Sequence, residues 1–124
     1  MVDARDVAAV AVAALTAPGH EGQTYVITGP EALSHARVAA ILSEAAGRPI
    51  TYRDMTLDAL RQQLVSGGAP SWLVEVRMEF TSVLREGFAA AVTDTVLRTT
   101  GRPPRTFAAF AAEHTARFRG PASA

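Results

Sequence analysis

Apolar residues recur at helical spacing along most of this chain, and glycine, proline or small polar residues interrupt the pattern. Val7, Val10 and Ala14 lie on one face of such a helix, which Pro18 ends, and this spacing is typical of amphipathic helices. The pattern predicts about five helices in all. Their expected starts are Asp3 or Asp6, Ser34, Thr56, Ser71 and the turn GRPPRT, and a weaker helical piece is expected at Asp94–Thr100. The last helix, after GRPPRT, carries an apolar stripe formed by Phe107, Phe110, Ala111, His114 and Phe118.

Two short stretches have the composition of β-strands. Residues 23–28 and 50–54 flank the helix that begins at Ser34. A connection of this length suits parallel strands, because a hairpin needs only a tight turn. We therefore expect an α+β fold, mainly helical, with about five helices around a two-strand parallel βαβ unit. Parallel sheets normally contain more strands, so the sequence supplies only part of a sheet.

The stretch QTYVITGPEALS resembles the strand, glycine turn and helix start of a dinucleotide-binding loop. Such a loop needs glycines at three set places, whereas this stretch has Gly29 alone, followed by Pro30, which lacks an N–H group. Ser34 comes five residues after the glycine, too late for a tight phosphate loop. We interpret the stretch as a plain connection and expect no cofactor-binding residues in this chain.

Composition excludes several classes of function. The chain has 124 residues, the size of one domain, and its 12 basic and 12 acidic residues give no net charge. Nothing in that balance attracts nucleic acid or an anionic membrane. The apolar run from Val7 to Leu15 is too short to span a bilayer and follows no basic region. With no cysteine, the sequence predicts a cytoplasmic domain at 1–119 and a disordered tail at 120–124.

Several segments occur in an order that resembles one enzyme family. VDARDVA, GQTYVITGPEALS, AAGRPI and TGRPPRTFAAF are similar to the carboxy-terminal portion of the NmrA-like, atypical short-chain dehydrogenases. The resemblance implies a relation to NAD(P)-binding reductases of quinones and other small molecules, or to redox sensors without turnover. It implies NAD(P) for a full-length member, whose glycine-rich loop and Tyr-x-x-x-Lys region have no counterpart here. The missing strands would belong to that absent Rossmann part.

Candidate site residues are few. Asp3 is expected as a helix cap, and the resemblance places its segment near a cleft between the two halves of the family fold. Trp72, Met78 and Phe80 are core residues of an amphipathic helix or the lining of a site for a flat apolar ligand.

Other polar residues give weaker signals. Arg102 and Arg105 bracket a Pro-Pro turn. They are interpreted either as part of a solvated loop tip or as residues that hold an anion. Tyr25 and Tyr52 are expected to lack a close histidine partner. The spacing of the three histidines predicts no metal site, and no residue is assigned as catalytic.

Three functional hypotheses follow. The first is the substrate-binding carboxy-terminal portion of an NmrA-like NAD(P)-dependent oxidoreductase, redox-inactive alone. The second is a stand-alone small-molecule-binding protein or a cofactor-independent enzyme of cyclase or isomerase type. The third is a structural or regulatory association module. An uncovered sheet edge predicts a homodimer or a complex with a cofactor-binding Rossmann partner chain. A small apolar molecule is the expected ligand, with no nucleic-acid or membrane partner.

Overall fold

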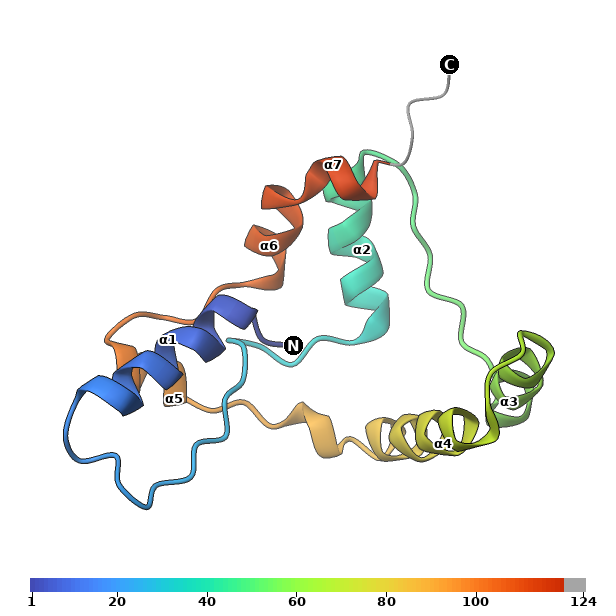
Figure 1. Ribbon diagram of the computed structural model, residues 1–124. Coiled ribbons are helices and arrows are strands. Elements are labelled where there is room, and N and C mark those ends of the chain that lie inside the picture. Colours follow the sequence, from blue (N-terminus) through green and yellow to red (C-terminus); the bar gives the residue numbers. More distant parts are fainter. Residues whose placement is uncertain (120–124) are drawn as a thin grey trace. The chain divides into compact units, whose positions relative to one another are not determined.

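The computed structural model describes residues 1–119, where helices are joined by loops (Figure 1). The helices are α1 (Ala4–Thr16), α2 (His35–Ala46), α3 (Leu57–Ser66), α4 (Ser71–Arg85), the 3-10 helix η1 (Phe88–Ala90), α5 (Thr95–Thr100), α6 (Phe107–Glu113) and α7 (Thr115–Phe118). No helix within 1–119 is long and apolar enough to cross a membrane. The tail predicted at 120–124 lies outside the described residues.

The helices group into two compact units. Unit 1 comprises Met1–Tyr52 together with the chain from Ala91 onward, and unit 2 comprises Arg53–Ala90. In unit 1, α1 packs beside α5, and α2 packs beside α6 and α7. In unit 2, α3 and α4 form a helical pair that continues into η1. The single domain predicted over 1–119 stays a prediction.

The first three helices begin where the sequence places capping residues. The side chains of Asp3, Ser34 and Thr56 each accept a hydrogen bond from a backbone N–H in the first turn of α1, α2 and α3. Such caps satisfy donors that have no partner within the helix. Gly47 ends α2 in the left-handed region at φ 68°, a conformation that glycine adopts without steric cost.

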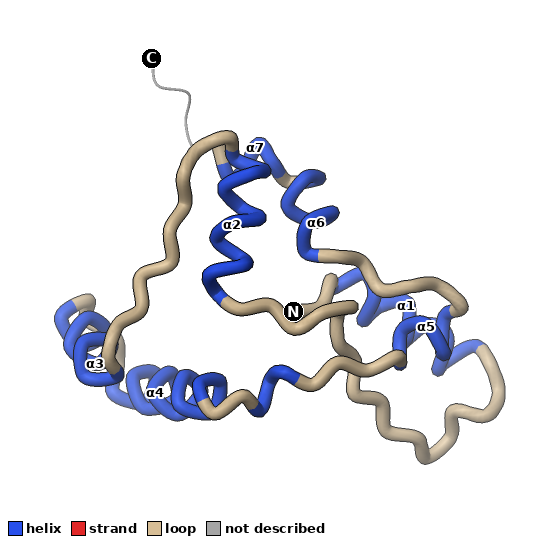
Figure 2. Tube along the Cα trace, turned by 180° about the vertical axis from the view of Figure 1, so that it is seen from behind, coloured by secondary structure: helices blue, strands red, loops and turns tan. Residues whose placement is uncertain are grey.

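The predicted βαβ unit is wrong, because no strand occurs within residues 1–119, and the segments 23–28 and 50–54 are loops (Figure 2). A strand exists only when a neighbour completes its hydrogen-bond ladder, and the described chain offers these segments none. Side chains bind the backbone instead. Thr93 donates its Oγ1 proton to the Val26 carbonyl at 2.7 Å, and Ser43 Oγ accepts the Ile50 N–H at 2.8 Å.

The last predicted helix is broken in two. His114 has φ −107° and ψ 18°, which separates α6 from α7. The aromatic stripe nevertheless continues across the break, since the Phe110 ring lies against His114 with centroids 4.5 Å apart and against Phe118 at 6.5 Å. Ring packing therefore follows the predicted stripe although the backbone does not stay helical.

The buried core lies mostly in unit 1. Its apolar members come from four helices, which the loops bring together from both ends of the chain. They are Val10, Ala39, Ile41, Ala46, Val96 and Ala111. Alanine and valine dominate, so helix axes can approach closely, but each residue buries little surface. In unit 2, the buried apolar residue is Val74 of α4.

Candidate functional site

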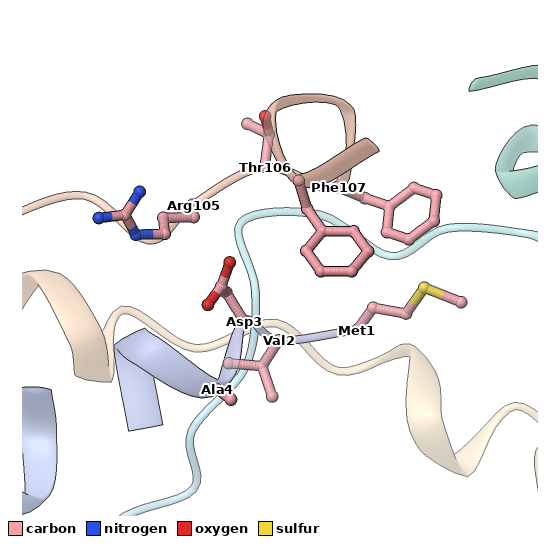
Figure 3. Close-up of a pocket in the computed structure, with 8 residues that line it drawn as sticks. Met1, Val2, Asp3, Ala4, Arg105, Thr106 and Phe107 are labelled. Atoms are coloured by element: carbon pink, nitrogen blue, oxygen red, sulfur yellow. The ribbon is translucent and has the colours of Figure 1, made fainter. Parts of the chain in front are cut away.

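A cavity of about 510 Å³ opens in unit 1, where the start of the chain meets the beginning of α6 (Figure 3). We name it the α6 cavity. Its lining residues are Met1, Val2, Asp3, Ala4, Arg105, Thr106, Phe107 and Phe110. Most of this wall is apolar, and the volume falls in the range typical of small-molecule sites, about 300–1,000 Å³.

Two helix starts fix the backbone around the α6 cavity. Asp3 caps α1 by accepting the Arg5 N–H at 2.8 Å, and Thr106 caps α6 by accepting the Ala109 N–H at 3.1 Å. Each cap holds its residue in extended conformation directly before a helix. Both lining segments therefore belong to ordered helix termini and not to free loops.

An ion-paired cluster borders the α6 cavity. The Arg5 guanidinium pairs with Asp3 and with Glu113, each at 2.7 Å. Asp6 is buried and accepts the backbone N–H of Arg105 at 2.7 Å, which ties α1 to the segment before α6. The Arg105 guanidinium makes looser pairs, at 3.9 Å to Asp6 and 3.6 Å to Glu113.

The hydrogen bonds from Arg5 lower the pKa of Asp3 from 3.8 to about 2. The Asp3 side chain is only 7% exposed, and both of its carboxylate oxygens accept hydrogen bonds from Arg5. A group held ionised in this way does not exchange protons near neutral pH. Asp3 therefore serves as a fixed anion that positions Arg5 and α1.

Comparison with known proteins relates the chain to reductases. It is 52% identical over 117 residues to NAD(P)H azoreductase of Xenophilus azovorans, covering 94% of this chain and 41% of that protein. It is 44% identical over 117 residues to (4-alkanoyl-5-oxo-2,5-dihydrofuran-3-yl)methyl phosphate reductase of Streptomyces griseus, with the same coverage of 94% and 41%. A scan of protein-family models finds none that matches.

Solved structures show the same fold. Triphenylmethane reductase of Citrobacter sp., complexed with NADP(H), superposes with a TM-score of 0.78 at 22% identity, over 92% of this chain and 39% of that one. An NADPH-dependent quinone oxidoreductase of Escherichia coli gives 0.74 at 26% identity, over 90% and 39%. The chain belongs to the NmrA-like, atypical short-chain dehydrogenase family. It spans about two fifths of the curated relatives that it matches and corresponds to their carboxy-terminal part.

The glycine of TGPEALS in this NmrA-like chain packs against the start of the chain. Gly29 is buried, and a Cβ atom added there would lie 2.0 Å from the backbone oxygen of Met1. The missing side chain thus admits the backbone of Met1. Pro30 follows without an N–H donor. The glycine serves close packing within unit 1.

The predicted site residues of this family member divide between the two units. Asp3 lines the α6 cavity. Trp72 and Phe80 lie on α4 in unit 2 and are 66% and 57% exposed, while Met78 on the same helix is half-buried. That these four residues bind a substrate stays a prediction. No group of three histidine or acidic residues that could hold a metal ion occurs in the part of the chain that the structure describes.

Sequence reasoning missed most of the cavity wall. Phe107 and Phe110 were expected only as the apolar face of a helix, and they line the α6 cavity as well. Arg105 was expected at a loop tip, or as the holder of an anion, and it also lines the cavity. The sequence does contain one signal for this arrangement, namely Thr106. A threonine that caps a helix fixes the positions of the arginine before it and of the phenylalanines after it.

Both tyrosines contact a histidine, contrary to expectation. The Tyr25 hydroxyl lies 2.6 Å from Nδ1 of His20, and the Tyr52 ring stacks on His35 with centroids 5.1 Å apart. The first pair is five residues apart in a loop, and the second joins α2 to a distant segment. Neither spacing gives a periodic signal in sequence. None of these four residues lines the α6 cavity.

Proposed function

We propose that this chain is the substrate-binding, carboxy-terminal portion of an NAD(P)H-dependent reductase, and that the α6 cavity is its substrate site. The observation that carries the proposal is the 52% identity to an NAD(P)H azoreductase over 94% of this chain. A cavity with an aromatic wall and few polar groups is the kind of site that holds a flat organic molecule.

The proposal assigns no redox step to this chain alone. Hydride transfer from NAD(P)H requires a bound nicotinamide nucleotide, which is normally held by a glycine-rich turn at a helix N-terminus. Gly29 instead packs against Met1. We therefore expect no saturable NADPH binding by the isolated chain at low micromolar concentration. A fluorescence titration that saturates in this range contradicts the expectation.

A chimera tests the assignment directly. The carboxy-terminal part of the Xenophilus azovorans azoreductase is exchanged for this chain, and NADPH oxidation is followed with an azo dye. Because the chain supplies the substrate side, the chimera should reduce the dye. Phe110→Ala in the chimera should raise KM for the dye and leave NADPH binding unchanged. A folded chimera that binds NADPH but reduces no dye contradicts the proposal.

A second function is favoured by one observation. All residues that line the α6 cavity belong to this chain, so the chain is suited to bind a small molecule by itself. Binding or cofactor-independent chemistry without NAD(P)H is the corresponding alternative. Ligand binding by the isolated chain together with an inactive, well-folded chimera would favour it.

We also propose that the chain associates through exposed apolar helix faces. On α1, Val12 and Leu15 are exposed at 60% and 86%, and such side chains are normally covered when they cluster. The partner is a second copy or a cofactor-binding Rossmann chain, in the cytoplasm where NAD(P)H-dependent reductases work. Sedimentation at low micromolar concentration decides it, since a monomer with a cooperative melt contradicts association.

A further inference from the structure

Helix α4 has a second apolar face besides the one that packs on α3. Trp72, Val76, Phe80 and Val83 follow one another at steps of four, four and three residues, which places their side chains in one stripe along a helix. All four are exposed, at 66%, 54%, 57% and 41%. The buried Val74 lies two residues from Trp72, which puts it about 160° around the helix from that side chain. We name the exposed face the α4 stripe.

Unit 2 lacks a helix that would cover the α4 stripe. It pairs α3 with α4 (Figure 1), and Val74 is its buried apolar residue. A helix with apolar residues on two opposite faces is normally covered on both. The stripe runs from Trp72 to Val83, about 17 Å along the axis, which matches three turns of a partner helix. One more helix packed there would turn the pair into a three-helix bundle.

Glutamates form one border of the α4 stripe. Glu75, Glu79 and Glu86 each come three residues after a member of the stripe, so all three lie on the same side of it. Glu75 pairs with Arg61 of α3. Glu79 and Glu86 are exposed and form no ion pair within residues 1–119. This border therefore offers two carboxylates to a partner that carries positive charge.

The opposite border of the α4 stripe is mostly apolar. Leu73 and Leu84 lie there and are half-buried, and Arg77 is its charged residue. The charges are thus arranged unequally about the stripe. Charged residues that flank an apolar seam between helices determine which helix pairs with which, and in which orientation. An antiparallel second copy would bring the glutamate border against itself, and like charges that face each other across an interface cost affinity.

We propose that the α4 stripe docks one helix of another protein, a basic amphipathic helix. Its apolar face would cover Trp72 and Phe80, the kind of large side chains that anchor interfaces. Its lysine or arginine residues would lie along the border that holds Glu79 and Glu86. None of the stripe residues lines the α6 cavity, so this inference does not rest on the proposed function.

Two designed peptides test the proposal on the intact chain. Both carry leucines at helical spacing and no tryptophan, with lysine at the remaining positions in one and glutamate in the other. Trp72 is the one tryptophan of the sequence, so its fluorescence reports on the stripe directly. We expect saturable binding of the basic peptide with a blue shift of Trp72 emission, at least about tenfold tighter than the acidic peptide at low salt. The preference should shrink at 1 M salt, where charges are screened beyond about 3 Å.

Three results of the peptide titration overturn the proposal. They are equal affinities of the two peptides, no binding of the basic peptide, and binding that leaves the emission of Trp72 unchanged. The last result would mean that the peptide binds elsewhere on the chain.

A charge variant assigns the preference to the glutamate border. Glu79→Gln combined with Glu86→Gln should reduce the preference for the basic peptide to about threefold or less, because the facing carboxylates are removed. The matched control is Glu31→Gln combined with Glu44→Gln, which removes the same charge from exposed positions of unit 1. An equal reduction in the control overturns the assignment to this border.

An apolar variant assigns the contact to the α4 stripe. Phe80→Ala should weaken the basic peptide about tenfold, because interface anchors carry most of the binding energy. Phe88→Ala is the control, since Phe88 is 73% exposed and lies on η1, outside the stripe. Equal losses in the two variants overturn the assignment. If Phe80→Ala does not fold, the charge variant, which alters exposed side chains alone, carries the test.

Sedimentation distinguishes a partner helix from a second copy. A dimer that Phe80→Ala dissociates shows that a second copy occupies the α4 stripe, and it overturns the proposal. Binding of the basic peptide to a monomer, or to a dimer that Phe80→Ala leaves intact, supports the partner helix.

Discussion

Different kinds of interaction stabilise unit 1 and unit 2, each by itself. Unit 1 packs α1 beside α5 and α2 beside α6, with buried side chains from all four helices, and it buries Asp6 against the Arg105 backbone. Unit 2 pairs two helices over Val74 and adds the exposed ion pairs Arg61–Glu75 and Arg85–Asp54. Exposed ion pairs contribute little to the free energy of unfolding. A unit below about 40 residues also buries too little surface to be stable alone. Burial, rather than the number of polar contacts, sets the expected stability of each unit.

The largest effect should come from Gly29→Ala in unit 1. The new Cβ atom would lie 2.0 Å from the Met1 backbone oxygen, so the backbone must shift and unit 1 should lose about 3 kcal/mol of unfolding free energy. Urea unfolding followed by circular dichroism measures this loss. The control is Gly87→Ala in unit 2, where φ is 83° and no atom is within 4 Å, with a cost of about 1 kcal/mol. Equal costs would mean that the Met1 contact is not tight.

Asp6→Ala should have the next largest effect. It removes the acceptor of the Arg105 N–H at 2.7 Å and leaves a donor with no partner, which costs about 2 kcal/mol. Asp94→Ala removes an exposed i,i+4 pair with Arg98 and should change stability by less than about 0.5 kcal/mol. Denaturant midpoints of both variants provide the comparison. Similar shifts would show that the buried contact is replaced by water.

Val74→Ala should affect unit 2 only. The substitution empties the buried centre of the α3–α4 pair, and we expect amide exchange of α3 and α4 to accelerate about tenfold or more, since truncation of a buried aliphatic side chain costs more than about 1 kcal/mol. Protection in α1 and α2 should stay unchanged. Parallel acceleration in all four helices would show that the two units unfold as one.

The smallest effect should be a pH dependence confined to unit 1. The folded-state pKa of Asp3 is lowered from 3.8 to about 2 by hydrogen bonds from Arg5. The ionised carboxylate therefore stabilises the fold above pH 3.8, and this contribution is lost as the pH falls toward 2. Thermal melts across this window should show a steeper fall for the wild type than for Asp3→Asn. Identical pH profiles would contradict the pKa shift.

The helices were predictable because their signals are local. Ser34 and Thr56 cap helices within a few residues of themselves, and Gly47 ends one by its own φ angle. The strands were not predictable in the same way, since a strand depends on a neighbour and the segments 23–28 and 50–54 find none within residues 1–119. The composition of these segments favours strands, but the prediction was wrong because no partner within residues 1–119 completes a sheet.

The candidate site was predictable only in part. Asp3 was identified as a cap, and it lies at the α6 cavity for that reason. Arg105 and Phe110 reach the same cavity through the packing of α1 against the segment before α6, which joins residues about 99 positions apart. No periodic pattern encodes such a contact. The charge of the cavity therefore emerged only from the structure.

The Asp6–Arg105 hydrogen bond also has a consequence for how the chain is made. It joins residues separated by 99 positions, and Thr28 and Thr93 are joined across 65, so the two segments of unit 1 enclose all of unit 2 in the sequence. During synthesis α1 and α2 leave the ribosome before α5 and α6. The apolar faces of α1 and α2 therefore stay uncovered until α5 and α6 have been made. Distant pairings of this kind slow folding and prolong exposure to aggregation. Unit 1 can close only after the segment around Arg105 has emerged, so its first two helices are exposed to chaperones while the residues between them and Arg105 are made.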